Sequence, residues 1–217
     1  MKIFIGYDPS YETDIDAKVC WGSLFRYEHE VHLLDKRTVD SVGYNRVDED
    51  GATAFTYTRF LVPLLCGYKG TALYMDSDFI WMVDPVELMG YFDQNSAVHV
   101  VKHDKMPVRS KTKMNGRATN EYYPCKWWSS LMLFNNEHQK CKRLSADYVN
   151  TATPEALHRF SWAGMPDVAD LPVEYNYLVG YYSDDIRPKA LHYTDGTPFY
   201  HEYPAGTPYV GAWREFA

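Results

Sequence analysis

The sequence predicts an α/β protein with a mixed, mostly parallel central sheet and helices on both faces. Short apolar runs of strand length alternate with segments of helical periodicity along the chain, as in sheets whose strands are joined by helical crossovers. The 217 residues suit one α/β domain with a sizeable core. No internal repeat or low-complexity linker divides the chain, so we expect a single domain over residues 1–217.

The expected strands share a short apolar run that ends at polar or turn-forming residues. They cover residues 2–6, 31–35, 71–76, 96–103, 129–136, 171–179 and 189–194. The expected helices share apolar positions at helical spacing or a proline suited to a first turn. They cover residues 13–27, 54–67, a short segment from Pro85, 137–148 and 154–162, with Pro63 expected to kink or end the second.

Composition and charge exclude several functional classes. Hydrophobic residues make up 46% and charged residues 24%, and no apolar run is long enough for a membrane span or a signal peptide. The formal charge of −7 argues against nucleic-acid binding through the whole surface. The four scattered cysteines indicate reduced thiols in a cytosol-like compartment. We therefore expect a cytoplasmic protein that binds neither nucleic acid nor a membrane.

Polar residues follow several expected strands at the point where each strand ends. They are Gly6–Asp8, Asp76–Asp78, His103–Asp104 and His192. In open α/β sheets, ligands bind at the carboxyl ends of the strands. These residues therefore predict a ligand site along one edge of the sheet.

Asp76 and Asp78 flank Ser77 directly after the apolar run "TALYM". Residues two apart in an extended segment point to the same side, so the two carboxylates converge and repel each other unless a cation lies between them. Oxygen ligands suit Mg²⁺ or Mn²⁺, and His192, at the end of "KALH", adds a nitrogen that favours Mn²⁺. The alternative is an aspartate that caps the following helix and a hydrogen-bonded core histidine.

Five segments, in order, resemble one enzyme family: "IFIGYD", "TYTRFLVP", "LYMDSD", "WWSSLMLFN" and "LHYTDGTPF". They resemble the retaining glycosyltransferases of the GT-A fold around glycogenin and the bacterial galactosyltransferases of lipo-oligosaccharide synthesis. The chain looks closest to the small glycosyltransferase domains of large algal viruses, which glycosylate the capsid protein and would work in the host cytoplasm. The resemblance implies a Rossmann-like GT-A domain, with a nucleotide-binding half at about 1–105 and an acceptor and sugar half at about 106–217.

The resemblance implies that the first strand and turn hold the nucleoside. Gly6, Tyr7, Asp8 and Tyr11 match the segment that lies near the base and ribose in the family. A tyrosine ring can stack on uracil, and a glycine permits close backbone approach. Arg59 matches the helix Arg or Lys that reaches the nucleotide-sugar. The alternatives are core packing for the tyrosines and a surface ion pair for Arg59.

The resemblance also implies the metal ligands. Asp76, Ser77 and Asp78 match the family's DxD motif, and His192 matches the third protein ligand of Mn²⁺, for which Mg²⁺ can substitute. The metal bridges the two phosphates and neutralises charge that develops on the departing UDP.

The segment after His192 departs from the family pattern. Gly196 and Thr197 match the turn whose backbone amides bind the diphosphate. The lysine that relatives often carry a few residues after the histidine is missing. Phosphate neutralisation then falls to another cation. The stretch from Lys102 to Lys126 holds seven Lys or Arg against two acidic residues, which fits a lid over the diphosphate, an acceptor-binding loop or a solvated loop.

The resemblance implies that three residues contact the donor sugar. Asp104 matches a carboxylate that grips sugar hydroxyls. Ser129 and Ser130 occupy the place beside the sugar where relatives have an NxG-like sequence, a departure that bears on sugar choice.

Relatives have a polar residue near the β face of the sugar, in the helix that follows, and this sequence differs from them at that place. The segment "HRFSWAGMPD" offers Ser161, Trp162 and Asp167 instead of an Asp-Gln pair. Front-face attack, with the leaving phosphate as base, is therefore our hypothesis for retention.

The sequence thus predicts a metal-dependent retaining glycosyltransferase. It would transfer a hexose or 6-deoxyhexose from a UDP-sugar, with UDP-glucose or a UDP-6-deoxyhexose as donor, to a glycan or glycoprotein acceptor. Two alternatives stay open. A haloacid dehalogenase-type phosphatase also has a DxD after an apolar strand, although it normally has Thr or Val where Ile80 stands. A non-catalytic nucleotide-sugar or glycan-binding module would use the same aromatic residues and metal.

Overall fold

The computed structural model describes residues 1–9, 15–46, 53–103, 111–113, 118–119 and 122–217. Its main sheet has six strands in the order β2-β1-β3-β8-β5-β9. These are β1 (Lys2–Gly6), β2 (Glu30–Leu34), β3 (Thr71–Met75), β5 (Val98–Val100), β8 (Leu131–Asn135) and β9 (Val168–Asp170). Strand β8 runs antiparallel to both its neighbours, and the other pairs are parallel. The predicted mixed, mostly parallel sheet is confirmed.

Two smaller sheets accompany the main one. The first has the order β10-β11-β4, with β4 (Phe79–Trp81), β10 (Tyr177–Leu178) and β11 (Ala190–His192). The second pairs β6 (Thr112–Lys113) with β7 (Ala118–Thr119).

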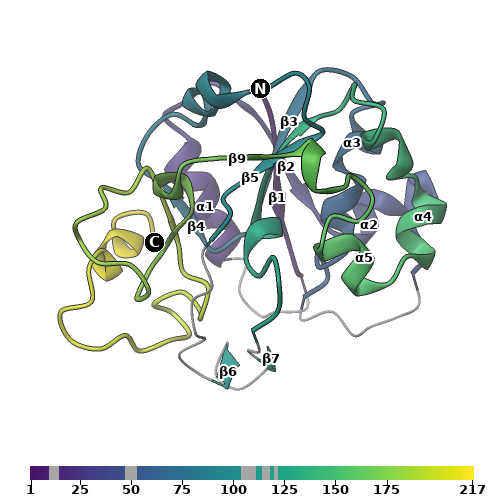
Figure 1. Cartoon of the computed structure of the whole chain (residues 1–217). Helices are drawn as coiled ribbons and strands as arrows, with labels where there is room; N and C mark the ends of the chain where they lie inside the picture. The colour runs from purple at the N-terminus through teal and green to yellow at the C-terminus, as the bar shows by residue number, and fades with distance from the viewer. Residues whose placement is uncertain (10–14, 47–52, 104–110, 114–117, 120–121) are drawn as a thin grey trace.

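Helices cover both faces of the main sheet (Figure 1). The α-helices are α1 (Ile15–Leu24), α2 (Lys36–Val39), α3 (Val62–Leu65), α4 (Ala146–Thr151) and α5 (Pro154–His158). The 3₁₀ helices are η1 (Asp40–Val42), η2 (Thr58–Leu61), η3 (Pro85–Tyr91), η4 (Trp128–Ser130), η5 (Cys141–Arg143), η6 (Met165–Asp167), η7 (Val173–Asn176) and η8 (Val210–Glu215). No helix in the described ranges is both long enough and apolar enough to cross a bilayer.

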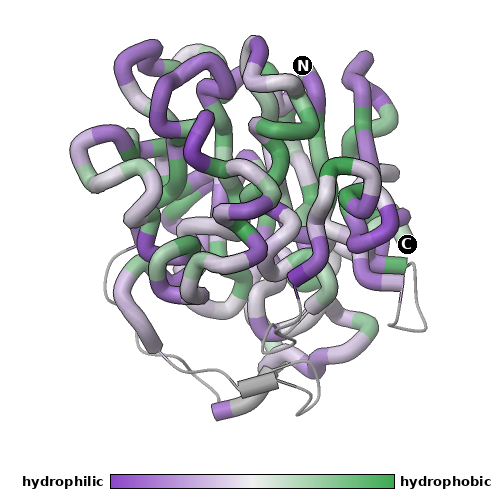
Figure 2. The backbone as a smooth tube through the Cα atoms, turned by 90° about the vertical axis from the view of Figure 1, so that its right-hand side faces the viewer, coloured by the Kyte–Doolittle hydropathy of each residue, from purple (hydrophilic) through white to green (hydrophobic). Residues whose placement is uncertain are grey.

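The strand sequences are almost continuously apolar because both faces of the sheet are buried. In β1, Ile3 and Ile5 pack against Cys20 of α1 on one face, while Phe4 belongs to the core on the other face with Phe60 of η2. Figure 2 shows hydrophobic segments running through the body of the molecule and hydrophilic residues concentrated at its turns. The alternation of strand side chains therefore builds two cores on one sheet.

Several elements differ from the prediction. The single helix expected over 54–67 is divided into η2 and α3, because Pro63 lacks an N–H group and lies in the first turn of α3. The segment 171–179 is mainly η7 followed by the two-residue β10, and β9 just before it forms the edge of the main sheet. The helix expected over 137–148 is shorter, as η5 and the start of α4.

Candidate active site

The carboxyl ends of β1 and β3 and the beginning of β8 meet at one edge of the main sheet. Directly after β3, the backbone N–H of Asp76 donates to the carbonyl of Ser130 at 2.9 Å. Strand β11 pairs antiparallel with β4, so His192 lies opposite Phe79, and their rings stack at 4.5 Å between centroids. This pairing brings the second half of the chain to the Asp76–Asp78 segment.

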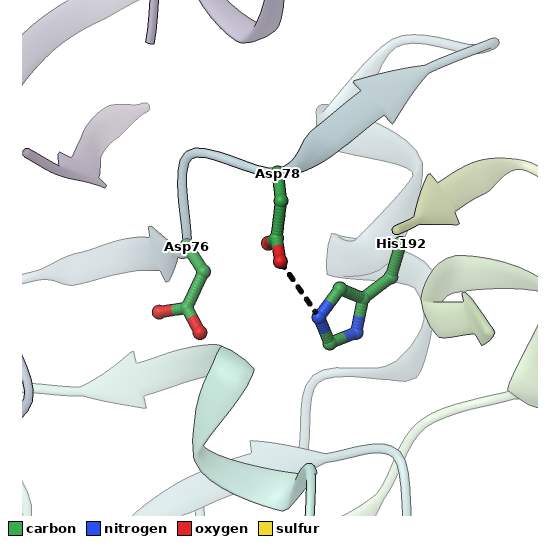
Figure 3. Close-up of side chains that lie close together, drawn as sticks. All are labelled: Asp76, Asp78 and His192. Carbon is green, nitrogen blue, oxygen red and sulfur yellow. Dashed lines mark ion pairs between the residues drawn. The ribbon is translucent and has the colours of Figure 1, made fainter. Parts of the chain in front are cut away.

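Asp76, Asp78 and His192 form a cluster that could hold a metal ion (Figure 3). One ligand atom from each lies within 4.8 Å of the others, and Nε2 of His192 is 3.4 Å from Oδ2 of Asp78. Oδ1 of Asp78 is buried and has no hydrogen-bond partner in the described part of the chain. Two carboxylates, one of them with an unsatisfied buried oxygen, and one imidazole fit a divalent cation such as Mn²⁺.

Three buried groups fix the tautomer of His192. The Ser130 hydroxyl donates to the Trp127 carbonyl at 2.6 Å and accepts from the Asn176 amide nitrogen at 3.0 Å. The amide oxygen of Asn176 is therefore left to accept from Nδ1 of His192, at 2.8 Å. Nδ1 of His192 is thus the donor of this bond, and Nε2, which faces Asp78, is the nitrogen that would bind a metal.

Asp76 is held by two other residues. Its Oδ1 accepts from the Tyr74 hydroxyl at 2.7 Å and lies 3.0 Å from the Arg59 guanidinium. Arg59 is itself buried, and it also donates to the Ser129 carbonyl at 2.9 Å. Burial raises the pKa of Asp76, and the charge of Arg59 opposes that rise. Arg59 thus contributes charge to the site and fixes one of its carboxylates.

The cluster lies in the wall of a cavity of about 560 Å³. This volume suits a nucleotide-sized ligand. The cavity brings together nine of the residues predicted from the sequence: Arg59, Asp76, Ser77, Asp78, Ser129, Ser130, His192, Gly196 and Thr197.

The residues predicted to hold the nucleoside lie beside the cavity. Gly6 ends β1 under the Phe55 ring and the Tyr74 hydroxyl, which a Cβ at position 6 would overlap. Asp8 accepts from the backbone N–H of Ala54 at 2.6 Å. Neither of them, nor Tyr7, is among the described residues that line the cavity. Gly6 is needed for packing, and its predicted role in nucleoside binding stays a prediction. Tyr11 and Asp104 lie outside the described residues.

Two predicted catalytic residues are not brought to the cavity. Trp162 is 1% exposed and packs in the core against Phe134 and Phe160. Asp167 ends η6, just before β9, and its carboxylate is 3.9 Å from Lys140. Of this part of the chain, the residues that line the cavity belong to α5 and its C-cap, which precede both Trp162 and Asp167.

Sequence reasoning missed several cavity residues. Nδ1 of His158, at the end of α5, is 2.9 Å from the Ser129 hydroxyl. Asp16 of α1 accepts from the Thr197 hydroxyl at 2.8 Å, and burial raises its pKa to about 7. The cavity is also lined by Tyr123, Lys126, Trp127, Glu155, Arg159 and Tyr200. The one sequence signal that could have indicated any of these residues was the basic stretch that ends at Lys126.

No family model matches the chain. Many solved structures share its fold, and three glycosyltransferases among them are 11–13% identical to the chain. GlyE, a glycosyltransferase of Streptococcus pneumoniae TIGR4, superposes with a TM-score of 0.63 at 13% identity, over 99% of this chain and 60% of GlyE. The galactosyltransferase LgtC, solved with donor and acceptor sugar analogues, gives 0.61 at 13% identity over 100% of this chain and 95% of LgtC. A glycosyltransferase involved in glycosylation of the PBCV-1 major capsid gives 0.51 at 11% identity, over 90% and 94% of the two chains.

The chain thus has the α/β fold of the GT-A glycosyltransferases, with an Asp-Asp-His cluster that could hold a metal ion. A curated relative gives the particular family. Protein CDI of Arabidopsis thaliana is 35% identical over 209 residues, which is 92% of this chain and 79% of that protein. The chain belongs to the family of Protein CDI.

Proposed function

We propose that the protein is a metal-dependent retaining glycosyltransferase that uses a UDP-sugar donor. The observation that carries this proposal is the Asp76–Asp78–His192 cluster in the wall of a cavity, in a GT-A fold. The donor sugar is a hexose or 6-deoxyhexose, with UDP-glucose or a UDP-6-deoxyhexose as the first donors to test. LgtC, of the same fold, was solved with donor and acceptor sugar analogues.

The acceptor is a glycan or glycoprotein. The sequence resemblance to algal-virus domains suggests a viral capsid glycoprotein in a host cytoplasm. The 35% identity to a plant protein favours a wider acceptor class. We therefore propose a glycan or glycoprotein acceptor in general and do not propose the viral capsid protein as the acceptor.

Asp76, Asp78 and His192 would hold the metal, with Mn²⁺ preferred and Mg²⁺ as substitute. When bound, such a cation neutralises charge on the diphosphate of the leaving nucleotide. The chain's own residues prepare this site: Arg59 and Tyr74 orient Asp76, and Asn176 orients His192. Gly196 and Thr197 follow His192 in the cavity wall. The N–H of Gly196 donates to the Tyr193 carbonyl at 2.8 Å, so we assign the predicted contact to a phosphate oxygen to the amide of Thr197.

Ser129 and His158 would orient the donor sugar. Their side chains are hydrogen-bonded to each other at 2.9 Å in the cavity wall, and both are groups that bond sugar hydroxyls. Among the described residues, four carboxylates line the cavity: Asp16, Asp76, Asp78 and Glu155. Two of these are the proposed metal ligands, and Glu155 is exposed.

The fourth carboxylate, Asp16, accepts a hydrogen bond from the Thr197 hydroxyl. We therefore propose front-face attack rather than a double displacement. In that mechanism the leaving phosphate accepts the proton of the attacking hydroxyl. Asp167 lies outside the cavity, so we propose no role for it in this mechanism.

The phosphatase alternative receives no support from this arrangement. It would need Asp76 as a free nucleophile, but Asp76 is ion-paired with Arg59 and accepts a hydrogen bond from Tyr74. The fold is that of GT-A proteins. The binding-module alternative predicts nucleotide-sugar binding without turnover, and it is addressed by the experiment below.

The test is to incubate the protein with Mn²⁺, a panel of UDP-sugars and a panel of glycan acceptors, and to measure UDP release. We expect acceptor-dependent UDP release that EDTA and the Asp78→Ala variant abolish, with retained anomeric configuration in the product by NMR. Binding of a UDP-sugar without release of UDP in any acceptor mixture would support the binding module. An inverted product would refute retention.

A further inference from the structure

Lys126 is a buried lysine in the wall of the cavity. It is 7% exposed, and lysine is seldom buried so fully without an electrostatic reason. Its ammonium lies 5.1 Å from the ring centroid of Tyr123 and 5.3 Å from that of Trp127, and both rings also line the cavity. The charge is therefore held between two aromatic faces next to the ligand space.

The backbone around Lys126 is strained. Cys125 and Trp127, its two neighbours, have positive φ angles of 64° and 68°. This conformation is unfavourable for residues other than glycine, and strain of this kind is concentrated at functional sites. The Trp127 ring packs edge-on against Tyr181, whose hydroxyl donates to Asp195 at 3.1 Å. The segment that presents Lys126 is thus fixed against the turn that follows His192.

A donor diphosphate in the cavity would face three basic residues of its wall: Arg59, Lys126 and Arg159. Arg59 is paired with Asp76, and Arg159, the C-cap residue of α5, is exposed. Residues 193–200 contain no Lys or Arg. A diphosphate that enters beside Asp76 and Asp78 adds negative charge, and an ammonium in a desolvated wall interacts with it more strongly than one in water.

We propose that Lys126 binds the diphosphate of the donor nucleotide and replaces the lysine that is absent after His192. This inference rests on the glycosyltransferase function proposed above. Loss of a charge-assisted contact of this kind lowers affinity about 10-fold to 100-fold. The loss should appear for ligands that carry the diphosphate and not for the nucleoside alone.

The experiment is calorimetric titration of UDP and of uridine, in Mn²⁺, into four proteins. They are the wild type, Lys126→Met, Lys126→Arg and the control Lys102→Met. Methionine keeps an unbranched side chain next to the Tyr123 and Trp127 rings and removes the charge. Lys102 is a matched control because its ammonium also lies near a tryptophan ring, 5.9 Å from Trp128, but it pairs with Asp170 and does not line the cavity.

We expect Lys126→Met to weaken UDP binding 10-fold or more, to leave uridine binding unchanged and to be partly rescued in Lys126→Arg. Lys102→Met should bind UDP like the wild type. Wild-type UDP affinity in Lys126→Met, or an equal loss for uridine and UDP, would overturn the role of Lys126 while leaving the proposed function intact. Absence of UDP binding in the wild type would instead refute the proposed function and this inference with it. If the methionine variant fails to fold in a thermal melt, Lys126→Gln serves for the same comparison.

Discussion

The amide oxygen of Asn176 accepts a hydrogen bond from Nδ1 of His192 at 2.8 Å, and this contact turns Nε2 of the same ring toward Asp78. Both residues are buried, at 0% and 2% exposed. A metal-binding histidine commonly depends on such an outer partner. Asn176 is therefore a positioning residue for the cluster.

Asn176→Leu should weaken Mn²⁺ binding about 10-fold to 100-fold, because the imidazole loses the acceptor that fixes its tautomer. Titration calorimetry with Mn²⁺ measures this. Asn136→Leu is the control, since Asn136 is equally buried but its amide donates to the Lys69 carbonyl, outside the cluster. Equal Mn²⁺ affinity in the two variants would remove the positioning role from Asn176.

Asp78→Asn should separate stability from ligand binding. The substitution removes one of two converging charges and replaces one carboxylate oxygen with an amide nitrogen. In EDTA we expect the free energy of unfolding to stay the same or rise by up to about 1 kcal/mol, while metal-dependent UDP binding is lost. Urea unfolding and UDP titration on the same preparation test both parts. A large loss of stability in EDTA would mean that Asp78 is structural.

His158→Phe should reduce turnover more than nucleotide binding. Phenylalanine keeps the edge-on packing against Phe60 but loses the bond to the Ser129 hydroxyl. We expect kcat to fall about 10-fold to 100-fold, the equivalent of one polar contact to the sugar, with UDP affinity within about 3-fold of wild type. Steady-state kinetics and UDP titration give the two values. A parallel loss of both would indicate a general disturbance of the cavity.

Acid should destabilise the protein through His103. Burial lowers the pKa of His103 from 6.5 to about 3, and its Nδ1 lies 2.8 Å from the Tyr182 hydroxyl. The folded state keeps the ring neutral while the unfolded state takes up a proton below pH 6.5, so stability is present above that pH and is lost as the pH falls. This loss is about 2 kcal/mol at pH 5.

The test compares urea unfolding of the wild type and of His103→Phe at pH 8 and pH 5, both in EDTA. The wild type should lose about 2 kcal/mol more than the variant between the two pH values. Parallel losses in the two proteins would show that His103 does not carry this acid sensitivity.

Gly6→Ala should destabilise the sheet edge. A Cβ there would overlap the Phe55 ring and the Tyr74 hydroxyl, and this hydroxyl bonds Asp76. We expect a loss of about 2 kcal/mol in the free energy of unfolding and weaker Mn²⁺ binding. Gly90→Ala, where nothing lies within 4 Å of the added carbon, is the control. Thermal melts and Mn²⁺ titration compare the two variants, which should differ in both readouts.

The sequence by itself determined the local features of this protein. Apolar runs such as residues 2–6 and 71–76 predicted strands, because a strand buried on both faces consists of consecutive apolar residues. The DxD at Asp76–Asp78 and the histidine at the end of "KALH" predicted a metal site because each follows a strand end. The five ordered motifs predicted the GT-A fold.

Only the tertiary structure decided which distant residues complete the site. Asn176 stands in a segment expected to be a strand, and Lys126 ends the basic stretch, so the sequence marks neither as a neighbour of the cluster. The pairing of β11 with β4 and the turn before β8 bring them to the site. Trp162 and Asp167 carried suitable chemistry but fold into the core and onto an outer turn. Side-chain placement depends on long-range packing and hydrogen-bond satisfaction, which no local pattern encodes.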